Sequence, residues 1–240
     1  MMAKNAIEWH TQIATAFDKK YSSSKNFKER YSIWTEVIDK YSNLDFHALD
    51  LGCGSGIFTF YLAERNKTVI GLDASVEMQK ICDTKKKNAG IGNVDFVNCN
   101  INSLEQALNK KVDFIVCSSV LEYLDDLDES LGLITRFMNQ NGLLIFSMPN
   151  KQSLYRKIEP LAFKITGRPE YYRYVKNVCT LNEIEEKLNA FGFDILESKY
   201  YGETPLLSKL LRKIGFSRYS DNLFIAVARL STQPANAVVA

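Results

Sequence analysis

The sequence predicts an α/β protein with a doubly wound, parallel sheet, and three observations favour this fold class. Short apolar segments alternate with amphipathic segments between residues 46 and 147. The segment 112–118 is almost continuously apolar, as a parallel strand covered on both faces should be. A turn with three glycines joins the first apolar segment to the first amphipathic one. Such regular alternation of strands and helices is typical of a parallel sheet with helices on both faces.

Periodicity and turn residues give the individual elements. Helices are expected over 5–41 with a break at 22–24, and near 57–65, 75–88, 102–109, 127–138 and 181–191. Strands are expected over 46–51, 68–72, 94–98, 112–118, 143–147, 193–198 and 223–228. Ser75 is a good N-cap for its helix, and a turn at Asn141-Gly142 is expected to lead into the fifth strand.

Length and composition limit the function classes. A chain of 240 residues, 46% of them hydrophobic and 24% charged, suits one large α/β domain or two small ones. The formal net charge of +2 gives no strong attraction to nucleic acid. The 5 cysteines form no CxxC pair, so we expect reduced thiols and no metal site. No signal peptide and no long apolar run is recognisable, so the expected location is cytoplasmic.

The stretch 49–56 (LDLGCGSG) is the motif on which the functional prediction depends. Its glycines let a ligand approach the backbone, and the following helix N-terminus offers unpaired N–H groups. The dinucleotide fingerprint would need a third glycine where Ile57 stands, and the lysine of a phosphate-binding P-loop is missing. Asp50 has no nearby cation in sequence, which favours a ligand with an ammonium group and no phosphate, such as S-adenosylmethionine. Asp73 closes the second strand, where an acid can bind ribose hydroxyls.

The stretches 49–56 and 71–75 (GLDAS) resemble the first two motifs of class I S-adenosylmethionine-dependent methyltransferases. The resemblance implies a Rossmann-like, mostly parallel sheet of seven strands, with the last strands forming its antiparallel end. It implies S-adenosyl-L-methionine as cofactor. The implied cofactor-binding residues are Tyr21, Asp50, Gly52, Cys53, Gly54, Gly56, Asp73, Ala74, Asn100, Ile101 and Ser118.

Together these features predict a single methyltransferase domain over 1–231. Its expected parts are a helical cap (1–42), a cofactor-binding core (43–149), a lid insertion after the fifth strand (150–179) and the C-terminal part of the sheet (180–230). The tail 232–240 carries no pattern and is expected to be disordered. The lid is expected to cover the acceptor with Tyr155, Tyr171, Tyr172 and Tyr174 and with Arg156, Arg168 and Arg173; stabilising surface helices are the alternative.

His10 and Tyr123 are the candidate catalytic residues. His10 lies on the N-terminal helix and could reach the site as a base, although methyl transfer from a sulfonium is a direct displacement that needs no base. Tyr123 stands where many relatives carry histidine, and packing beside the cofactor is its alternative role. Glu122 is expected only to cap or solvate the next helix. The acidic run 125–129 is most simply favourable charge at a helix N-terminus, and no metal site is predicted.

Residues 10–150, with the first motifs and Met148-Pro149-Asn150, resemble ubiquinone-pathway O-methyltransferases, which implies a small-molecule acceptor and oxygen as the methylated atom. Nitrogen or carbon transfer, a protein substrate, and a non-catalytic cofactor-binding protein remain alternatives, because the fold does not fix the acceptor. Nucleic acid is not expected as a partner. The segment 205–215 has leucines at helical spacing with basic residues opposite, so it either packs on the core or forms a peripheral membrane contact. The oligomeric state stays open.

Overall fold

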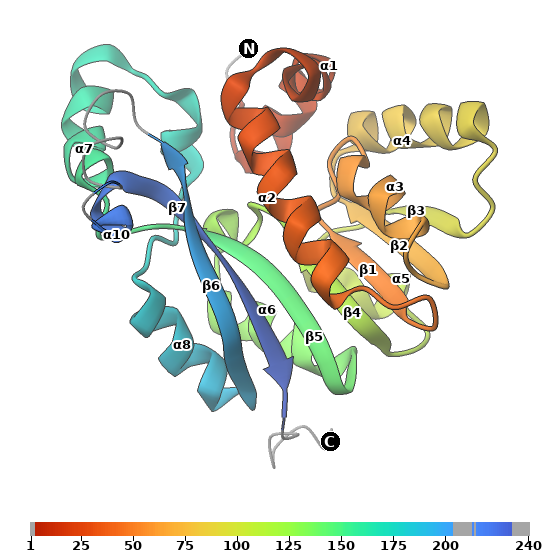
Figure 1. The fold of residues 1–240 in the computed structure, drawn as a ribbon. Coiled ribbons are helices and arrows are strands. Elements are labelled where there is room, and N and C mark those ends of the chain that lie inside the picture. Colours follow the sequence, from red (N-terminus) through yellow and green to blue (C-terminus); the bar gives the residue numbers. More distant parts are fainter. Residues whose placement is uncertain (1–2, 204–212, 214, 232–240) are drawn as a thin grey trace.

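The computed structural model shows one seven-stranded sheet with helices on both faces (Figure 1). It describes residues 3–203, 213 and 215–231. The strands are β1 (His47–Leu51), β2 (Thr68–Asp73), β3 (Val94–Asn98), β4 (Val112–Cys117), β5 (Met138–Pro149), β6 (Phe193–Glu203) and β7 (Asp221–Leu230). Their order across the sheet is β3-β2-β1-β4-β5-β7-β6, and only β7 runs antiparallel to its neighbours. The chain order reverses between β1 and β4, which is where ligands bind in such sheets.

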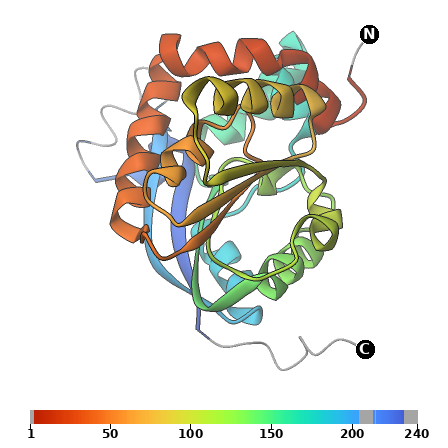
Figure 2. The same ribbon diagram turned by 90° about the vertical axis from the view of Figure 1, so that its right-hand side faces the viewer.

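Helices cover the two faces of the sheet in separate layers (Figure 2). The helices are α1 (Ala6–Ser23), α2 (Lys25–Tyr41), α3 (Ile57–Ala63), α4 (Val76–Ala89), α5 (Leu104–Ala107), α6 (Leu127–Arg136), α7 (Leu154–Thr166), α8 (Leu181–Ala190) and α10 (Ser217–Ser220), with 3-10 turns η1 (Ile101–Ser103), η2 (Leu121–Tyr123) and η3 (Glu170–Tyr174). One core contains Trp34 of α2 and Phe58 of α3 against the sheet. The other contains Ile134 of α6 and Leu188 of α8 on the opposite face.

The predicted fold class is confirmed, and the differences are local. The Ser22–Ser24 break is real, because α1 ends at Ser23 and Ser24 has extended φ and ψ of −93° and 131°. The prediction that Asn141-Gly142 precedes the fifth strand is wrong. β5 already begins at Met138, which pairs with Val112, and Asn141 (φ 62°) lies inside the strand where the register with β4 shifts. Five residue steps along β5 (138 to 143) correspond to two along β4 (112 to 114), so Asn141 lies in an irregularity within the strand rather than before its start.

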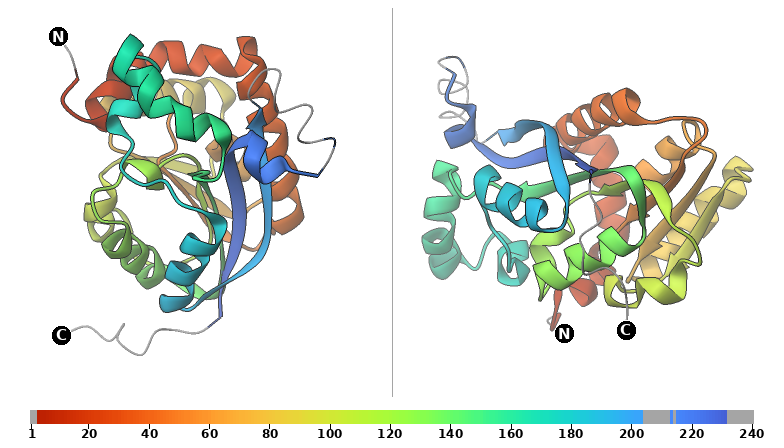
Figure 3. Two further views of the ribbon diagram at one scale, coloured as in Figure 1. Left: turned by 90° about the vertical axis from the view of Figure 1, so that its left-hand side faces the viewer. Right: turned by 90° about the horizontal axis from the view of Figure 1, so that it is seen from below.

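α1 is attached across the carboxyl ends of the parallel strands. Asn5 caps it by accepting a hydrogen bond from the Glu8 amide, a cap that contributes about 1 kcal/mol. Lys85 of α4 forms a 2.5 Å ion pair with Asp18, and Thr11 donates a 2.8 Å hydrogen bond to the Ser75 hydroxyl. These contacts hold α1 above the loops that follow β1 and β2. Figure 3 shows α7 beside α1 at the same end of the sheet.

Two predictions fall largely outside the described residues: the membrane-surface segment 205–215 and the tail 232–240. Among the helices that the structure does describe, none has the length and apolarity required to cross a membrane. The division of 1–231 into cap, core, lid and C-terminal part stays a prediction.

Candidate functional site

A cavity of about 660 Å³ opens under α1, at the carboxyl ends of β1 to β5. Its size falls in the range of about 300–1,000 Å³ that is typical of small-ligand sites. The predicted residues that line it are His10, Gly52, Gly54, Asp73, Ala74, Asn100, Ile101, Ser118 and Tyr123. Tyr21, Asp50 and Cys53 line a small side cavity of about 30 Å³ behind the glycine loop. Gly56 lines neither, because it is the N-cap of α3 and packs against Phe60 and Cys82.

The glycine loop is held in a shape that other residues cannot adopt. Gly52 has φ +72°, and a Cβ on it would lie 2.2 Å from Cγ2 of Val120. Gly54 has φ +54°, and its N–H donates a 2.8 Å hydrogen bond to Oδ2 of Asp73. The left-handed conformation and the close contact both require glycine. The loop is therefore a rigid wall of the cavity.

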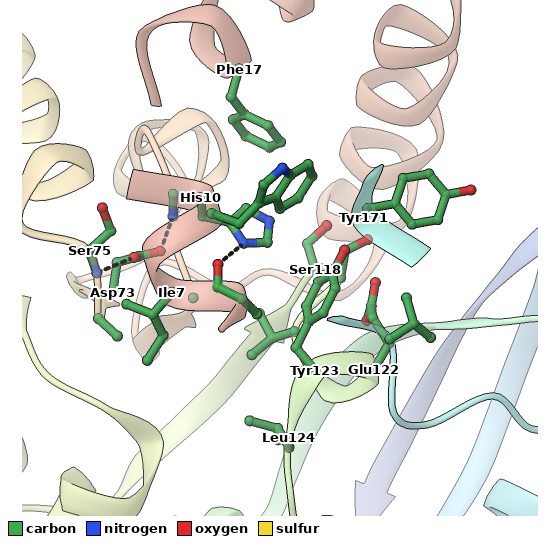
Figure 4. Close-up of a pocket in the computed structure, with 18 of the residues that line it drawn as sticks. Ile7, His10, Phe17, Asp73, Ser75, Ser118, Glu122, Tyr123, Leu124 and Tyr171 are labelled. Atoms are coloured by element: carbon green, nitrogen blue, oxygen red, sulfur yellow. Dashed lines mark hydrogen bonds between the residues drawn. The ribbon is translucent and has the colours of Figure 1, made fainter. Parts of the chain in front are cut away.

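Asp73 connects this loop to the start of α4. Its Oδ1 accepts a 2.8 Å hydrogen bond from the Ser75 amide while Oδ2 accepts the one from Gly54 (Figure 4). Burial raises the pKa of Asp73, and the two backbone hydrogen bonds oppose this rise. Each carboxylate oxygen has a second lone pair, so Asp73 can accept further hydrogen bonds from hydroxyl groups in the cavity.

Asp50 lies beneath the loop rather than at its mouth. Its side chain is buried, and Oδ2 accepts a 2.6 Å hydrogen bond from the Thr59 hydroxyl. Oδ1 is also buried and has no hydrogen-bond partner among the described residues. Burial raises the pKa of Asp50 to about 7. A buried, half-satisfied carboxylate is costly, which makes Asp50 a strong acceptor for a cationic donor.

Arg30 is a site residue that the sequence analysis missed. It comes from α2 and donates from Nη2 to the carbonyl oxygen of Ser118 at 3.0 Å and to its hydroxyl. Its Nε is buried without a hydrogen-bond partner in the part of the chain that the structure describes. Arg30 and Asp50 line the same side cavity. Two residues that line this side cavity therefore each carry an unsatisfied buried atom, an acceptor on Asp50 and a donor on Arg30.

His10 projects from α1 into the cavity between Asp73 and Tyr123 (Figure 4). Its Nδ1 lies 2.9 Å from the carbonyl oxygen of Ala6, which can only accept a hydrogen bond. Nδ1 therefore carries the proton, and Nε2 keeps its lone pair. Burial lowers the pKa of His10, so the neutral ring predominates at pH 7. This is the form that a general base requires.

Tyr123 packs its ring edge-on against His10, with the ring centroids 5.1 Å apart. Burial raises the pKa of its phenol far above 10, so the side chain stays protonated. The prediction that Glu122 is solvated or a cap is wrong. Its side chain is only 3% exposed, Oε2 has no partner within the described residues, and burial raises its pKa to about 7. η2 holds Glu122 inward because the amides of Lys176 and Asn177 bind its carbonyl oxygen.

Residues 43–200 match a protein family described as a methyltransferase domain, and this span is more than half of the chain. The chain belongs to this family. The match includes the glycine loop, Asp73 and Glu122.

Curated relatives of this methyltransferase are identical to it at about a quarter of the aligned positions. It is 25% identical over 164 residues to a ubiquinone biosynthesis O-methyltransferase of Paracidovorax citrulli, covering 66% of this chain and 67% of that protein. It is 26% identical over 188 residues to a malonyl-[acyl-carrier protein] O-methyltransferase of Hamiltonella defensa, covering 74% and 69%.

A solved structure has the same fold as this methyltransferase. It is an N-methyltransferase of Bradyrhizobium japonicum in complex with S-adenosyl-L-homocysteine, with a TM-score of 0.69, 14% identity and coverage of 95% and 100% of the two chains. By family and fold, this protein is a class I S-adenosylmethionine-dependent methyltransferase.

The predicted lid residues divide into two groups. Arg156 of α7 and Tyr171 of η3 line the cavity of the methyltransferase. Both are held by the buried Glu159, which accepts 2.6 Å hydrogen bonds from Arg156 Nη1 and from the Tyr171 hydroxyl. Tyr174 instead packs against Trp9 and donates to the Ala3 carbonyl oxygen at 3.0 Å. The remaining predicted lid residues do not line the cavity: Tyr155, Arg168, Tyr172 and Arg173.

The acidic run acts at a helix N-terminus. Asp126 is the N-cap of α6 and accepts a 2.9 Å hydrogen bond from the Glu129 amide. No cluster of potential metal ligands occurs among the residues that the structure describes. The five cysteines are free thiols, and Cys82 donates to the Gly54 carbonyl oxygen from behind the glycine loop.

Proposed function

We propose that this methyltransferase moves a methyl group from S-adenosylmethionine to an oxygen atom of a small-molecule acceptor by direct displacement. The observation that carries the proposal is the pair of unsatisfied buried atoms beside the glycine loop, Asp50 Oδ1 and Arg30 Nε. They match the ammonium and carboxylate groups of the amino-acid end of this cofactor. Buried polar atoms are normally satisfied, so an unpaired acceptor and an unpaired donor in one small cavity indicate a zwitterionic ligand group.

The rest of the cavity fits the nucleoside end. In the proposed arrangement Asp73 binds the ribose hydroxyls with its remaining lone pairs, and Ala74 and Ile101 contact the adenine. Asn100 uses Oδ1 to accept a 3.2 Å hydrogen bond from the Asn102 amide. Its NH₂ group is therefore the part that can donate to an adenine nitrogen. Tyr21 and Phe17 reach the side cavity from α1 and cover the amino-acid end.

The chain's own contribution to the reaction is alignment, exclusion of water and removal of a proton. The bound cofactor supplies a methyl group that is already activated by the positive sulfur. α1 covers the cavity, which favours displacement over reaction with water. His10 Nε2 takes the proton of the acceptor hydroxyl. Tyr123 remains a neutral phenol that orients the His10 ring.

The acceptor is proposed to bind on the side of the main cavity that lies away from Asp73 (Figure 4). Glu122, Arg156 and Tyr171 line this side and bring a hydrogen-bond acceptor, a cation and an aromatic ring together. Residues 150–179 thereby serve as the lid. An oxygen acceptor is supported by a neutral base at His10 and by the O-methyltransferase relatives. Enclosure by α1 and α7 suits a small molecule better than a folded protein.

Calorimetric titration with S-adenosylmethionine tests the cofactor site. Saturable binding is expected, and Gly54→Val should abolish it because a side chain at φ +54° would strain the loop and face Phe17. Gly92→Val is the matched control, since no atom lies within 4 Å of the added Cβ and the backbone is ordinary. Equal affinity in the Gly54 variant, or tight binding of NADH, would show that the loop holds another ligand.

An acceptor screen tests the reaction. Purified protein with labelled S-adenosylmethionine should methylate a phenol or a carboxylate, with mass spectrometry locating the new methyl group on oxygen. Turnover of amines alone would replace oxygen by nitrogen as the accepting atom. Saturable cofactor binding with no turnover across phenols, carboxylates and amines would favour a non-catalytic cofactor-binding protein.

A further inference from the structure

Helix α7 buries two charged side chains, Arg156 and Glu159, and exposes its large apolar side chains. Arg156 lines the cavity and Glu159 is paired with it, with side-chain exposures of 8% and 1%. On the opposite side, four large apolar side chains are exposed: Leu154 (37%), Ile158 (61%), Leu161 (61%) and Ile165 (74%). Their spacing of four, three and four residues places them in one stripe along the helix. A helix that only packs on the core shows the reverse pattern.

Single exposed apolar residues are ordinary, so the arrangement matters more than the exposure. Leu44 and Val76 are exposed by 71% and 51%, but each is isolated on its element. The four residues of α7 form a continuous apolar surface, which we call the α7 stripe. Contiguous surfaces of this kind mark interaction sites. Phe216, 48% exposed, precedes α10, which contacts α7.

Basic residues border the α7 stripe. Lys157 and Lys164 are exposed, lie on one side of the stripe, and form no ion pair among the described residues. The only acid of α7, Glu159, points inward and is paired with Arg156. Arg168 follows the helix and is also exposed. The outer surface of α7 is therefore apolar along its centre and positive at its edge.

We propose that the α7 stripe docks on an anionic lipid surface. A helix of this composition lies in the plane of the interface, with its apolar side chains among the acyl chains and its lysines at the headgroups. Anionic lipids attract lysines that lie near the membrane surface. A protein groove offers no equally general match to an apolar stripe with a basic edge. The stripe thus binds phospholipid with negative headgroups.

The opposite face of the same helix gives the docking a functional consequence. α7 is about 10 Å across, so a docked stripe brings the Arg156 side of the cavity within one helix diameter of the lipid. Lipid contact would also reduce the freedom of the proposed lid.

Sedimentation of the full chain with vesicles tests the proposal. Binding is expected to vesicles of phosphatidylglycerol mixed with phosphatidylcholine and not to phosphatidylcholine alone, and 0.5 M NaCl should weaken it. The variant Ile158→Glu/Leu161→Glu should bind at least tenfold more weakly. Leu44→Glu and Val76→Glu are matched controls at isolated exposed apolar positions and should bind as the unaltered chain does.

A second variant, Lys157→Glu/Lys164→Glu, changes only exposed charges, so loss of core packing cannot explain any change in its lipid binding. It should lose the preference for phosphatidylglycerol while keeping its affinity for S-adenosylmethionine in calorimetry. Absence of vesicle binding by the unaltered chain would overturn the proposal. So would binding by both α7 variants that is as strong as that of the unaltered chain. A concentration-dependent dimer in light scattering that Ile158→Glu/Leu161→Glu abolishes would instead assign the stripe to a second copy of the chain.

Discussion

Asp50→Asn separates the charge of the buried carboxylate from its shape. The amide has the same size, and its oxygen can still accept the 2.6 Å hydrogen bond from Thr59. Its NH₂ group would then occupy the position of Oδ1, which has no partner among the described residues. The substitution therefore removes a negative charge and replaces an acceptor by a donor, with little change in packing.

The expected effect on stability follows from the pKa of Asp50, which burial raises from 3.8 to about 7. A raised pKa means that the carboxyl contributes stability at low pH and loses this contribution as the pH rises through 7. At pH 8 the carboxyl is ionised in both the folded and the unfolded protein. At pH 5, two units below its folded pKa, it is protonated in the folded protein and still mostly ionised in the unfolded one. At about 1.4 kcal/mol per unit, the free energy of unfolding of the unaltered protein should increase by about 3 kcal/mol relative to the variant.

Urea unfolding at pH 5 and pH 8 measures this difference, because other titrating groups such as Glu122 are common to both proteins and cancel. S-adenosylmethionine should bind the variant roughly 10- to 150-fold more weakly at pH 8, for the loss of one charge-assisted hydrogen bond of about 1.5–3 kcal/mol. Asp95→Asn, at an exposed carboxylate, is the control and should change neither quantity. An identical pH dependence of stability in both proteins would refute the buried-charge argument, and unchanged affinity would refute the role of Asp50 in binding.

Four further changes probe other parts of the site. Asp73→Ala should weaken S-adenosylmethionine binding more than tenfold in calorimetry, because two charge-assisted hydrogen bonds are lost; a change below threefold would place the ribose elsewhere. Gly52→Ala should lower the melting temperature, because its Cβ would lie 2.2 Å from Val120, and Val120→Ala should restore part of the loss. His10→Gln should reduce turnover at least tenfold with cofactor affinity kept. Because burial lowers the pKa of His10, the acid limb of the unaltered kcat/KM profile should lie below pH 6.5 and vanish in this variant. Glu159→Gln should raise the KM of the acceptor and leave cofactor affinity within threefold, since it breaks only the buried ion pair of the lid.

The sequence predicts which loop residues gather around the two cavities, because local chemistry decides their positions. Gly52 and Gly54 need a left-handed backbone, and no distant residue changes that requirement. Asp73 follows directly from the end of β2, and parallel strands bring their carboxyl ends to one edge of the sheet. The predicted residues near these strand ends accordingly meet around the two cavities, with Gly56 as the exception.

Two other residues of the site, Arg30 and Glu122, are placed by contacts between segments that lie far apart in the chain. Arg30 reaches the site through hydrogen bonds to Ser118, 88 positions later, and nothing in α2 distinguishes it from the neighbouring Lys25 and Lys28. Glu122 looked like a surface acid because its local sequence is acidic. It is buried because a segment more than 50 residues later binds its carbonyl oxygen. Burial of a single charged side chain is thus a tertiary effect that local patterns do not predict.

Composition misled the lid prediction in a related way. Tyrosines and arginines in 150–179 suggested that the whole set faces the acceptor, but one face of a helix can hold only about a third of its residues. The orientation of α7 places Arg156 on the cavity wall but not Tyr155, its direct neighbour in the chain. The same orientation turns the apolar residues outward, and only the structure reveals that choice.

The charges around the cavity are consistent with a cationic methyl donor. Asp50 and Glu122 are buried and unsatisfied, and burial raises both pKa values to about 7. Burial outweighs the attraction of the nearby Arg30 guanidinium, so each carboxyl readily holds its proton near neutral pH. A positive sulfur and an ammonium group reverse this preference by Coulomb attraction in a poorly solvated space. Under the proposed function, transfer of the methyl group leaves a neutral thioether, so Glu122 loses an attractive charge while Asp50 keeps the ammonium. The product keeps its contacts at the amino-acid, ribose and adenine groups but loses the attraction between Glu122 and the positive sulfur, which favours its exchange for a new methyl donor.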